Sequence, residues 1–288
     1  MKFITTIIQE VDEALKAFLP TERSFHPRLS KAMAYSIFAG GKRLRPILTL
    51  LCNQMLNGDK NNAMPAACAI EMIHTYSLIH DDLPAMDNDD LRRGKATNHI
   101  AFDEATAILA GDGLLTHAFT TIVEYTPDKI IASKLVSTLS KAAGPRGMVG
   151  GQMADMLGNS KNTIKSLEKI HKGKTAAMIA AALKMGAQSA QASHKQANQL
   201  YDAGIAMGLA FQITDDLLDI ESTSAVLGKS VGKDIAQNKA TYPAILGKVK
   251  ARNLAQKYCQ ESIDCFNQYG SKADKLIKIT QSILDRKK

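Results

Sequence analysis

Two clusters of aspartates are the residues of this chain whose types and spacing most clearly indicate chemistry. They are Asp81, Asp82 and Asp87 in the first cluster and Asp215, Asp216 and Asp219 in the second. Six like charges brought together would repel one another and take up protons unless a cation lay between them. Carboxylates without neighbouring Cys or paired His favour Mg²⁺ over zinc or copper, and protein-bound Mg²⁺ usually completes its shell with phosphate oxygens. The clusters therefore predict a magnesium site and a phosphorylated substrate.

The spacing within each cluster predicts how its carboxylates are presented. In the second cluster, Asp215, Asp216 and Asp219 follow Gln212 at helical intervals and project from one helical face. In the first, Pro84 disfavours a helix beyond residue 83, so two aspartates lie on the last helical turn and the third returns from the following loop. One such pattern arises by chance in about a few per cent of chains of this length. Two of them, both on apolar helices, favour a functional site over accidental surface acid.

Basic residues near these clusters are candidates for binding an anionic substrate. Arg92 and Arg93 directly follow the first cluster, and Lys42, Arg43 and Arg45 lie in a turn before a helix, where backbone N–H groups also face outward. Further candidates are Lys174, Lys229 and Lys239. Each basic residue alone is more often a solvated surface charge. The two turns that contain arginine are the strongest candidates, because the planar guanidinium matches a terminal phosphate better than lysine does.

His74 lies seven residues before Asp81, on the same face of the same expected helix. A histidine on an apolar helix is usually a hydrogen-bonded core residue, whereas its alignment with the carboxylates suits a donor to a phosphate. Both interpretations stay open at this point.

Two nucleotide-binding motifs are excluded. A P-loop places a glycine five residues before its Gly-Lys-Ser/Thr, but that position is Glu168 before Gly173–Thr175 and Thr223 before Gly228–Ser230. No GxGxxG follows a strand-like run, so a dinucleotide fold is unsupported. The net charge of +8 suits an anionic partner, but the basic residues are spread along the chain without a nucleic-acid-binding signature. We therefore predict no nucleic-acid partner.

The composition favours helices, because Ala, Leu, Ile, Met and Lys are plentiful and Trp is absent. The four cysteines show neither CxxC spacing nor a dense framework, so we interpret them as reduced thiols. Early acidic residues argue against a signal peptide, and no apolar run approaches the ~20 residues that span a bilayer. We expect a soluble, cytoplasmic protein without an integral membrane segment.

Helical spacing of apolar residues throughout the chain indicates one all-α domain, residues 1–288. Ser193 and Gln196 form a candidate capping box, Gly186 is expected to end the preceding helix, and no run alternates as a strand would. The expected helices cover residues 2–19, 28–39, 45–57, 64–83, 99–124, 128–142, 146–157, 163–185, 194–220, 236–250, 252–269 and 272–286. Helices 64–83 and 194–220 are apolar on most sides, yet each carries acid near its C-terminal end, where the helix dipole opposes it. Such a local conflict indicates function.

Together these residues resemble the trans-isoprenyl diphosphate synthases, and among them most closely the bacterial farnesyl diphosphate synthases. The likeness extends from about residue 38 to residue 243, and the four residues between Asp82 and Asp87 match the bacterial and plant-type form of the first motif. Beyond the aspartate clusters it rests on motifs at Gly40–Pro46, Leu91–Gly94, Gly150–Gln152, Lys174–Thr175, Phe211–Gln212 and Lys239–Pro243.

The resemblance implies a single all-α bundle of about twelve helices around a central cavity, a homodimer, and three Mg²⁺ ions between the facing aspartate clusters. By that resemblance Asp81 and Asp87 bind two ions and Asp215 binds the third, with the other aspartates as nearby or water-mediated ligands. The positions that match the allylic diphosphate site are Arg92, Lys174, Thr175, Gln212, Lys229 and Lys239. Those that match the isopentenyl diphosphate site are Lys42, Arg45, His74 and Arg93.

The implied reaction joins isopentenyl diphosphate to dimethylallyl and geranyl diphosphate, giving (2E,6E)-farnesyl diphosphate by ionisation, condensation and elimination. Mg²⁺ and the basic residues would stabilise the departing diphosphate. Lys174, Thr175 and Gln212 are the expected catalytic residues, with the hydroxyl and amide carbonyl dipoles stabilising the allylic cation. The alternatives are a geranylgeranyl diphosphate synthase, a terpene cyclase, or a non-catalytic subunit that binds prenyl diphosphates.

Tyr76, five positions before Asp81, matches the place where the family associates a bulky aromatic with stopping at farnesyl diphosphate; the alternative is an ordinary core tyrosine. The chain departs from the family pattern at Ala96, where Pro is usual, and at Ala240, where Ser is frequent. The ending Arg286-Lys287-Lys288 only loosely matches the basic tail that covers the isopentenyl site in the family.

Overall fold

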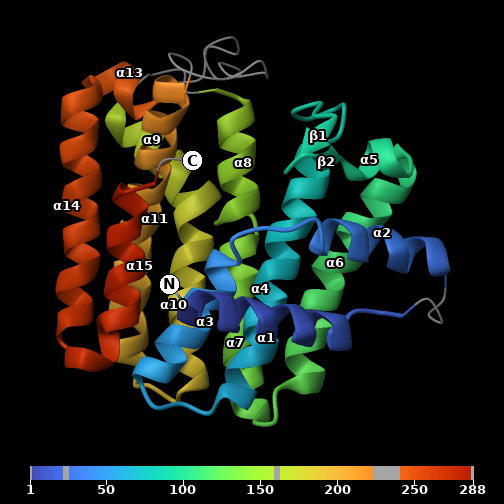
Figure 1. Ribbon diagram of the computed structural model, residues 1–288, viewed down its shortest axis with the longest axis horizontal. Coiled ribbons are helices and arrows are strands. Elements are labelled where there is room, and N and C mark those ends of the chain that lie inside the picture. The colour runs from blue at the N-terminus through green and yellow to red at the C-terminus, as the bar shows by residue number, and fades with distance from the viewer. Residues whose placement is uncertain (1, 22–25, 159–162, 223–240, 287–288) are drawn as a thin grey trace.

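The structure is a computed structural model that describes residues 2–21, 26–158, 163–222 and 241–286. It is a single bundle of helices with a short two-stranded hairpin at one end (Figure 1), which confirms the expected all-α fold. The helices are α1 (Lys2–Phe18), α2 (Pro27–Ile37), α3 (Leu44–Met55), α4 (Lys60–Asp81), α5 (Asn98–Ala101), α6 (Glu104–Tyr125), α7 (Lys129–Ala143), α8 (Met148–Met156), α9 (Ile164–His171), α10 (Ala177–Ser189), α11 (His194–Ser222), α13 (Tyr242–Leu246), α14 (Lys248–Asn267) and α15 (Asp274–Leu284).

Polar side chains cap several helices and set where they begin. Asp59 accepts a hydrogen bond from a backbone N–H of the first turn at 2.9 Å, so α4 begins earlier than expected. Asp103 caps α6 in the same way at 2.7 Å, which divides the expected helix 99–124 into α5 and α6. The capping box of Ser193 and Gln196 is confirmed, since each backbone N–H donates to the other side chain, at 3.1 and 3.2 Å.

Two expectations about local structure were wrong. Gly186 does not end a helix, because α10 continues through it to Ser189. At this glycine α10 approaches α3 so closely that a Cβ would collide with the Thr49 carbonyl oxygen, so the residue serves helix packing. The chain also contains strands, because β1 (Leu91–Arg92) pairs antiparallel with β2 (Lys95–Ala96).

Two expected long helices are interrupted. A π-helical turn over Lys172–Ala176 separates α9 from α10 within the expected helix 163–185. Gly247 separates α13 from α14, so the break lies earlier than the expected boundary near residue 251. The first residues of the expected helix 236–250 lie outside the described part of the chain.

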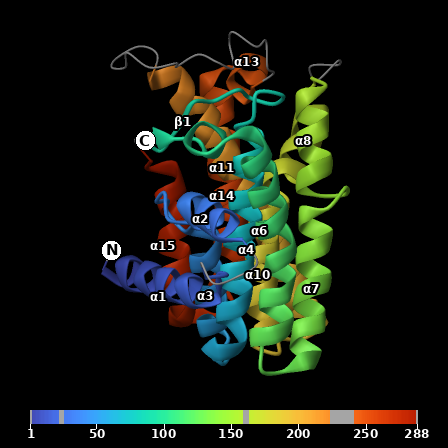
Figure 2. The ribbon, with the colours of Figure 1, turned by 90° about the vertical axis from the view of Figure 1, so that its right-hand side faces the viewer.

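The centre of the bundle is formed by α4, α10 and α11. Eleven of the thirteen residues of α10 are buried, and α10 packs against α3, α4, α7 and α11. Each fully buried Leu or Met contributes about 1.5–3 kcal/mol. Figure 2 shows α6, α7 and α8 together on one face, where α6 covers α4. The two helices that carry the aspartate clusters are thereby held within a rigid core.

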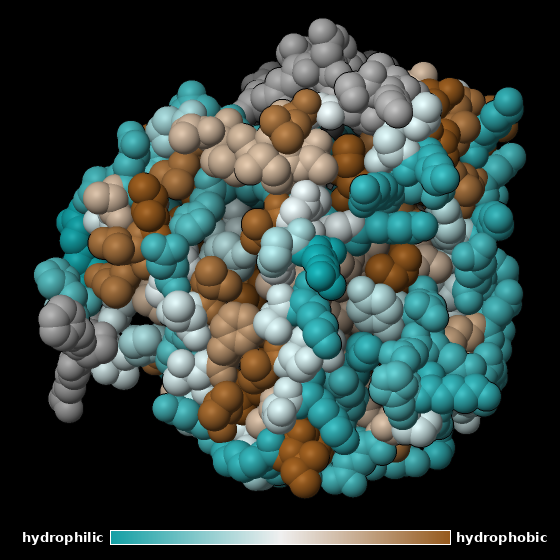
Figure 3. All heavy atoms as spheres, turned by 180° about the vertical axis from the view of Figure 1, so that it is seen from behind, coloured by the Kyte–Doolittle hydropathy of each residue, from teal (hydrophilic) through white to brown (hydrophobic). Residues whose placement is uncertain are grey.

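The expectation that no segment is long and apolar enough to cross a bilayer does not hold for α6. It is the one helix of the described residues that meets this test of length and composition, and 39% of its most apolar window is buried against the protein. Ile108, Leu109, Val123 and Tyr125 of α6 are exposed. Figure 3 shows one face of the molecule, on which hydrophilic side chains predominate and apolar ones gather in separate patches.

Candidate active site

The two aspartate clusters lie at the same end of the bundle. Helices α4 and α11 both end there, near the β1–β2 hairpin and α13 (Figure 1). The central helix α10 packs against both of them. The two clusters are therefore carried by separate helices that a common neighbour holds in place.

The loop after α4 turns the first cluster back on itself. The backbone N–H of Asp87 donates to the carbonyl oxygen of Asp81 at 2.8 Å, and that of Asp89 donates to the carbonyl oxygen of Asp82 at 3.1 Å. The Asp82 side chain is buried; its Oδ1 accepts a hydrogen bond from Nε of Arg92 at 2.7 Å and lies 2.6 Å from Nη2 of the same arginine. Asp82 thus ties the loop to the hairpin.

The Asp81 carboxyl group lies in a partly buried position beside α8. Its Oδ1 accepts a hydrogen bond from Nε2 of Gln152 at 2.8 Å. Burial raises the pKa of Asp81 to about 6, with the charge of Lys174 opposing this shift and that of Asp87 adding to it. A carboxylate that is costly to ionise in this way gains from a nearby cation.

The π turn carries two of the predicted catalytic residues, Lys174 and Thr175. Such turns interrupt α-helices chiefly at functional sites. The ammonium group of Lys174 lies 2.6 Å from Oδ2 of Asp155 on α8. The helix can approach the turn because residue 151 is glycine, where a Cβ would collide with the backbone of Lys174. The close contact of α8 with the π turn therefore fixes the position of the Lys174 backbone, from which its side chain extends.

A relay of hydrogen bonds continues from the π turn to α11 and α13. The hydroxyl of Thr175 donates to Oε1 of Gln212 at 2.9 Å, and Nε2 of Gln212 donates to Oδ1 of Asp216 at 3.0 Å. The backbone N–H of Tyr242 donates to Oδ2 of the same aspartate at 3.0 Å. The orientation of the Gln212 amide is therefore set by both neighbours. Together with the Gln152 and Asp155 contacts, the relay connects the ends of α4, α8, α11 and α13.

Asp215 faces away from that relay, toward the C-terminal helix. Its Oδ1 lies 2.7 Å from Nη1 of Arg286, although this nitrogen is not aligned to donate a hydrogen bond. The guanidinium of Arg286 lies over the ring of Phe211, 4.4 Å from its centroid. Burial raises the pKa of Asp215, and the attraction of Arg286 opposes the shift. The carboxylate of Asp215 is therefore held by an ion pair with Arg286.

A cavity of about 900 Å³ opens beside this ion pair. Its polar lining includes Lys42, Arg45, His74, Arg93 and Arg286. Burial lowers the pKa of His74 well below its ordinary value, and the charges of Arg45 and Arg93 lower it further, so the imidazole is neutral at pH 7. Nε of Arg45 is buried without a hydrogen-bond partner. The excess of positive charge and this orphan donor suit an anionic ligand.

The aspartate clusters have the donor chemistry of a magnesium site. Among the residues described, no three Asp, Glu, His or Cys side chains are already gathered closely enough to hold one metal ion. The ligand atoms nevertheless fit Mg²⁺, since they are carboxylate oxygens, and burial raises the pKa values of both Asp81 and Asp215. A divalent cation would offset the cost of ionising them.

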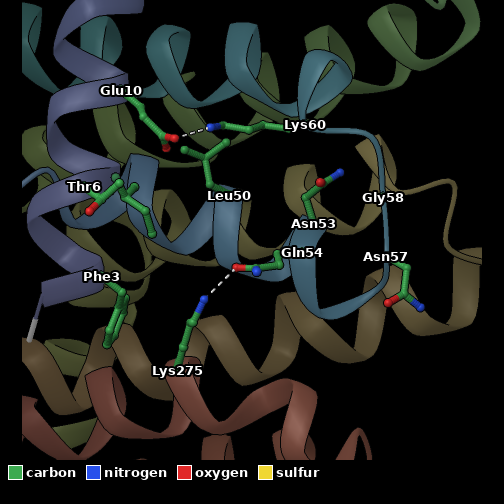
Figure 4. A pocket seen from close by; sticks show the side chains of 11 residues that line it. Phe3, Thr6, Glu10, Leu50, Asn53, Gln54, Asn57, Gly58, Lys60 and Lys275 are labelled. Carbon is green, nitrogen blue, oxygen red and sulfur yellow. Dashed lines mark hydrogen bonds and ion pairs between the residues drawn. The ribbon is translucent and has the colours of Figure 1, made fainter.

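A second cavity, of about 580 Å³, lies between α1, α3, α4 and α15 (Figure 4). Its Lys60 pairs with Glu10 at 2.7 Å, and its Lys275 donates to Gln54 at 3.2 Å. Neither aspartate cluster lines it. With its basic groups already engaged, this cavity is a poor candidate for the reaction site.

Some residues of the site were missed from sequence. Asp155 was not singled out, although it follows Gln152 at a helical interval on α8. Glu71 was also missed; it lines the cationic cavity while almost fully buried. The predicted substrate-binding residues Lys229 and Lys239 lie outside the described part of the chain.

The chain is similar to known proteins over most of its length. Residues 26–280 match the family model described as polyprenyl synthetase. The chain is 52% identical over 256 residues to a farnesyl diphosphate synthase of Geobacillus stearothermophilus, covering 87% of this chain and 86% of the relative. It is 45% identical to a geranylgeranyl diphosphate synthase of Cyanophora paradoxa, covering 88% and 86%. The crystal structure of an FPP/GFPP synthase from Zymomonas mobilis superposes with a TM-score of 0.87 at 36% identity, covering 98% of each chain.

Proposed function

The chain belongs to the polyprenyl synthetase family, and we propose that it condenses isopentenyl diphosphate with dimethylallyl and then geranyl diphosphate to form (2E,6E)-farnesyl diphosphate. It is a short-chain trans-prenyltransferase. One observation carries the proposal: the residues that line the cationic cavity do not include the aspartates at the end of α4, so the two places are separate. The site therefore offers two places for an anionic group, as the joining of two diphosphates requires.

In this proposal the cavity binds isopentenyl diphosphate. Lys42, Arg45 and Arg93 supply positive charge to its diphosphate, and the neutral imidazole of His74 supplies a hydrogen bond. The apolar remainder of the lining, which comes from α1, α3, α11 and α15, suits the short hydrocarbon part.

The allylic diphosphate binds beside the first aspartate cluster. Arg92 and Lys174 supply the basic groups within the described residues, and Lys229 and Lys239 belong to the same proposed set. Asp81, Asp87 and Asp215 would hold three Mg²⁺ ions, which when bound neutralise the charge that develops on the departing diphosphate. The ion pairs of Arg92 with Asp82 and of Lys174 with Asp155 hold both basic groups at the site beforehand.

The Thr175–Gln212 pair positions the dipoles that face the allylic cation. Departure of the diphosphate leaves a positive charge on carbon, which oriented hydroxyl and carbonyl oxygens stabilise without reorganising. The hydrogen bond between these two side chains, and that from Gln212 to Asp216, hold both oxygens in place. The isopentenyl double bond, held close by the neighbouring cavity, then attacks the cation, and the carbocation so formed loses a proton to the released diphosphate, which gives the new double bond.

The test is product analysis. Labelled isopentenyl diphosphate is incubated with Mg²⁺ and with dimethylallyl, geranyl or farnesyl diphosphate, and the dephosphorylated products are separated by chromatography. Farnesol from the first two primers, without extension of the third, supports the proposal. Extension of the farnesyl primer identifies a geranylgeranyl diphosphate synthase. Hydrocarbon from farnesyl diphosphate alone identifies a terpene cyclase, and binding without turnover or Mg²⁺ dependence identifies a non-catalytic subunit.

The proposal includes a homodimer that covers the exposed face of α6. Leu109 and Val123 on this helix are 58% and 51% exposed, which is unusual for large apolar side chains on one helix. A second copy that uses the same face buries them in a symmetric interface. Light scattering should give about twice the chain mass of 31.2 kDa. The four cysteines are free, in keeping with the reducing, cytoplasmic location that we propose.

A further inference from the structure

One basic residue of the cationic loop, Arg43, lines the cavity with its neighbours, but its guanidinium donors are paired with protein groups. Arg43 lies between Lys42 and Leu44 at the start of α3, and its side chain is almost completely buried. Its backbone has φ +49°, in the left-handed region that non-glycine residues rarely adopt. Interactions of the side chain must therefore hold the loop in this conformation.

The guanidinium of Arg43 is held from three directions. Its Nε donates to Oδ1 of Asp12 at 2.9 Å, its Nη1 to Oε1 of Glu71 at 3.0 Å, and its Nη2 to the carbonyl oxygen of Ile37 at 2.7 Å. Removing a buried guanidinium from water is costly unless its donors are paired, and here two carboxylates and a carbonyl pair with it. We call Asp12, Arg43 and Glu71 the Arg43 cluster.

The Arg43 cluster joins three separate walls of the isopentenyl cavity. Glu71 lies on α4, three residues before His74, and its side chain is 2% exposed. Asp12 lies on α1, whose Ile4 and Ile8 form part of the apolar lining. Arg43 itself lies in the loop that carries Lys42 and Arg45 of the cavity. One buried ion cluster therefore connects α1, α4 and the loop.

We propose that the Arg43 cluster is the positioning element of the isopentenyl diphosphate site. The donors of Arg43 stay paired with protein groups, and the cluster sets the loop from which Lys42 and Arg45 reach the cavity. The two carboxylates more than offset the single charge of Arg43, so that this guanidinium does not compete for the diphosphate. The inference rests on the proposed function, because it assigns the cavity to isopentenyl diphosphate. Through Asp12, α1 takes part in positioning the isopentenyl diphosphate site, although it carries neither aspartate cluster.

The test compares two carboxylates of α1 that differ in their partner. Asp12→Asn removes the negative charge beside Arg43. Glu10→Gln is the matched control, because Glu10 pairs instead with Lys60 at 2.7 Å on the other side of the helix. Steady-state kinetics are measured with isopentenyl diphosphate varied at saturating geranyl diphosphate, and then the reverse. We expect Asp12→Asn to raise KM for isopentenyl diphosphate about tenfold, the effect of losing one charged hydrogen bond. KM for geranyl diphosphate and kcat should change less than about twofold, and Glu10→Gln should change none of the three.

A second pair of variants tests whether Asp12 acts through Arg43. Arg43→Gln should raise the same KM at least as much, and adding Asp12→Asn to it should raise KM no further. Arg43→Lys keeps the charge but not the three-way fork, so it should not restore the wild-type value.

The outcomes separate the inference from the proposed function. If the wild-type protein makes no prenyl product, the proposed function is refuted. If it does, the inference fails when Asp12→Asn raises both KM values equally or lowers only the melting temperature. It also fails when Glu10→Gln matches the effect of Asp12→Asn. It fails as well when the increases in KM caused by Asp12→Asn and Arg43→Gln multiply in the double variant. If Arg43→Gln does not fold, the comparison of the two α1 variants still decides.

Discussion

Replacing Tyr76 by alanine should lengthen the product. Tyr76 lies on α4, five residues before Asp81, and is 6% exposed. Its ring packs edge-on against His80, with centroids 5.8 Å apart. Burial raises the pKa of Tyr76 to about 12, and the charge of Asp81 adds to the shift. The phenol ring is larger than one five-carbon prenyl unit, so its removal leaves room for another.

The size of the effect follows from packing. Forcing even a few extra methylene groups into a filled space costs about 1–3 kcal/mol, and a prenyl unit against the ring should exceed this. A penalty of about 4 kcal/mol disfavours the next condensation roughly a thousandfold. Tyr76→Ala removes that barrier but leaves a cavity, which should destabilise the fold by about 3 kcal/mol and lower Tm by roughly 6–12 °C.

The assay is chromatography of dephosphorylated products from labelled isopentenyl diphosphate, together with thermal unfolding. Tyr76→Ala should give geranylgeranyl or longer products, whereas Tyr76→Phe, which keeps the ring, should still give farnesyl product. An unchanged farnesyl product accompanied by the expected fall in Tm would refute the reasoning. It would show that Tyr76 is an ordinary core residue and that another group limits the chain.

Three further changes test other parts of the site. Gly151→Ala places a methyl group against the backbone of Lys174. We therefore expect kcat to fall about tenfold or more with little change in secondary structure. Unchanged kinetics would contradict the argument that α8 and the π turn need this close contact. Arg286→Gln frees Asp215, so calorimetry in the presence of pyrophosphate should show tighter Mg²⁺ binding, and equal affinity would make the ion pair incidental. The raised pKa of Asp81, about 6, means that the metal-free fold holds an extra proton between about pH 4 and 6 and loses stability as pH rises through that window. Mg²⁺ affinity should accordingly rise with pH up to about 6, and Asp81→Asn should weaken this dependence, leaving the part that Asp215 contributes.

Sequence spacing predicted the helices well where one face is apolar over several turns, as in α1 and α7. It failed where tertiary contacts override local signals. Gly186 has the chemistry of a helix stop, but the close approach of α3 requires a glycine in the middle of α10. The π turn likewise has no signature in the spacing of apolar residues. It shifts the helical register by one residue at the place where α8 packs against it, and this contact is not visible in the local sequence.

The chemistry of the site was largely determined by the sequence itself. Two aspartate clusters, with arginines and lysines at fixed intervals, specify oxygen ligands for Mg²⁺ and basic groups for diphosphates, because residue type alone sets these preferences. Spacing could also place each cluster at the end of an apolar helix.

The tertiary structure decided which partner each of these groups has. Only the fold shows that Arg43 pairs with Asp12 and Glu71, and that Asp215 meets Arg286 from the far end of the chain. These pairs join segments far apart in sequence, so no local pattern encodes them. Their geometry follows from how α1, α4, α11 and α15 pack, since burial makes each charge depend on the partner that the packing supplies.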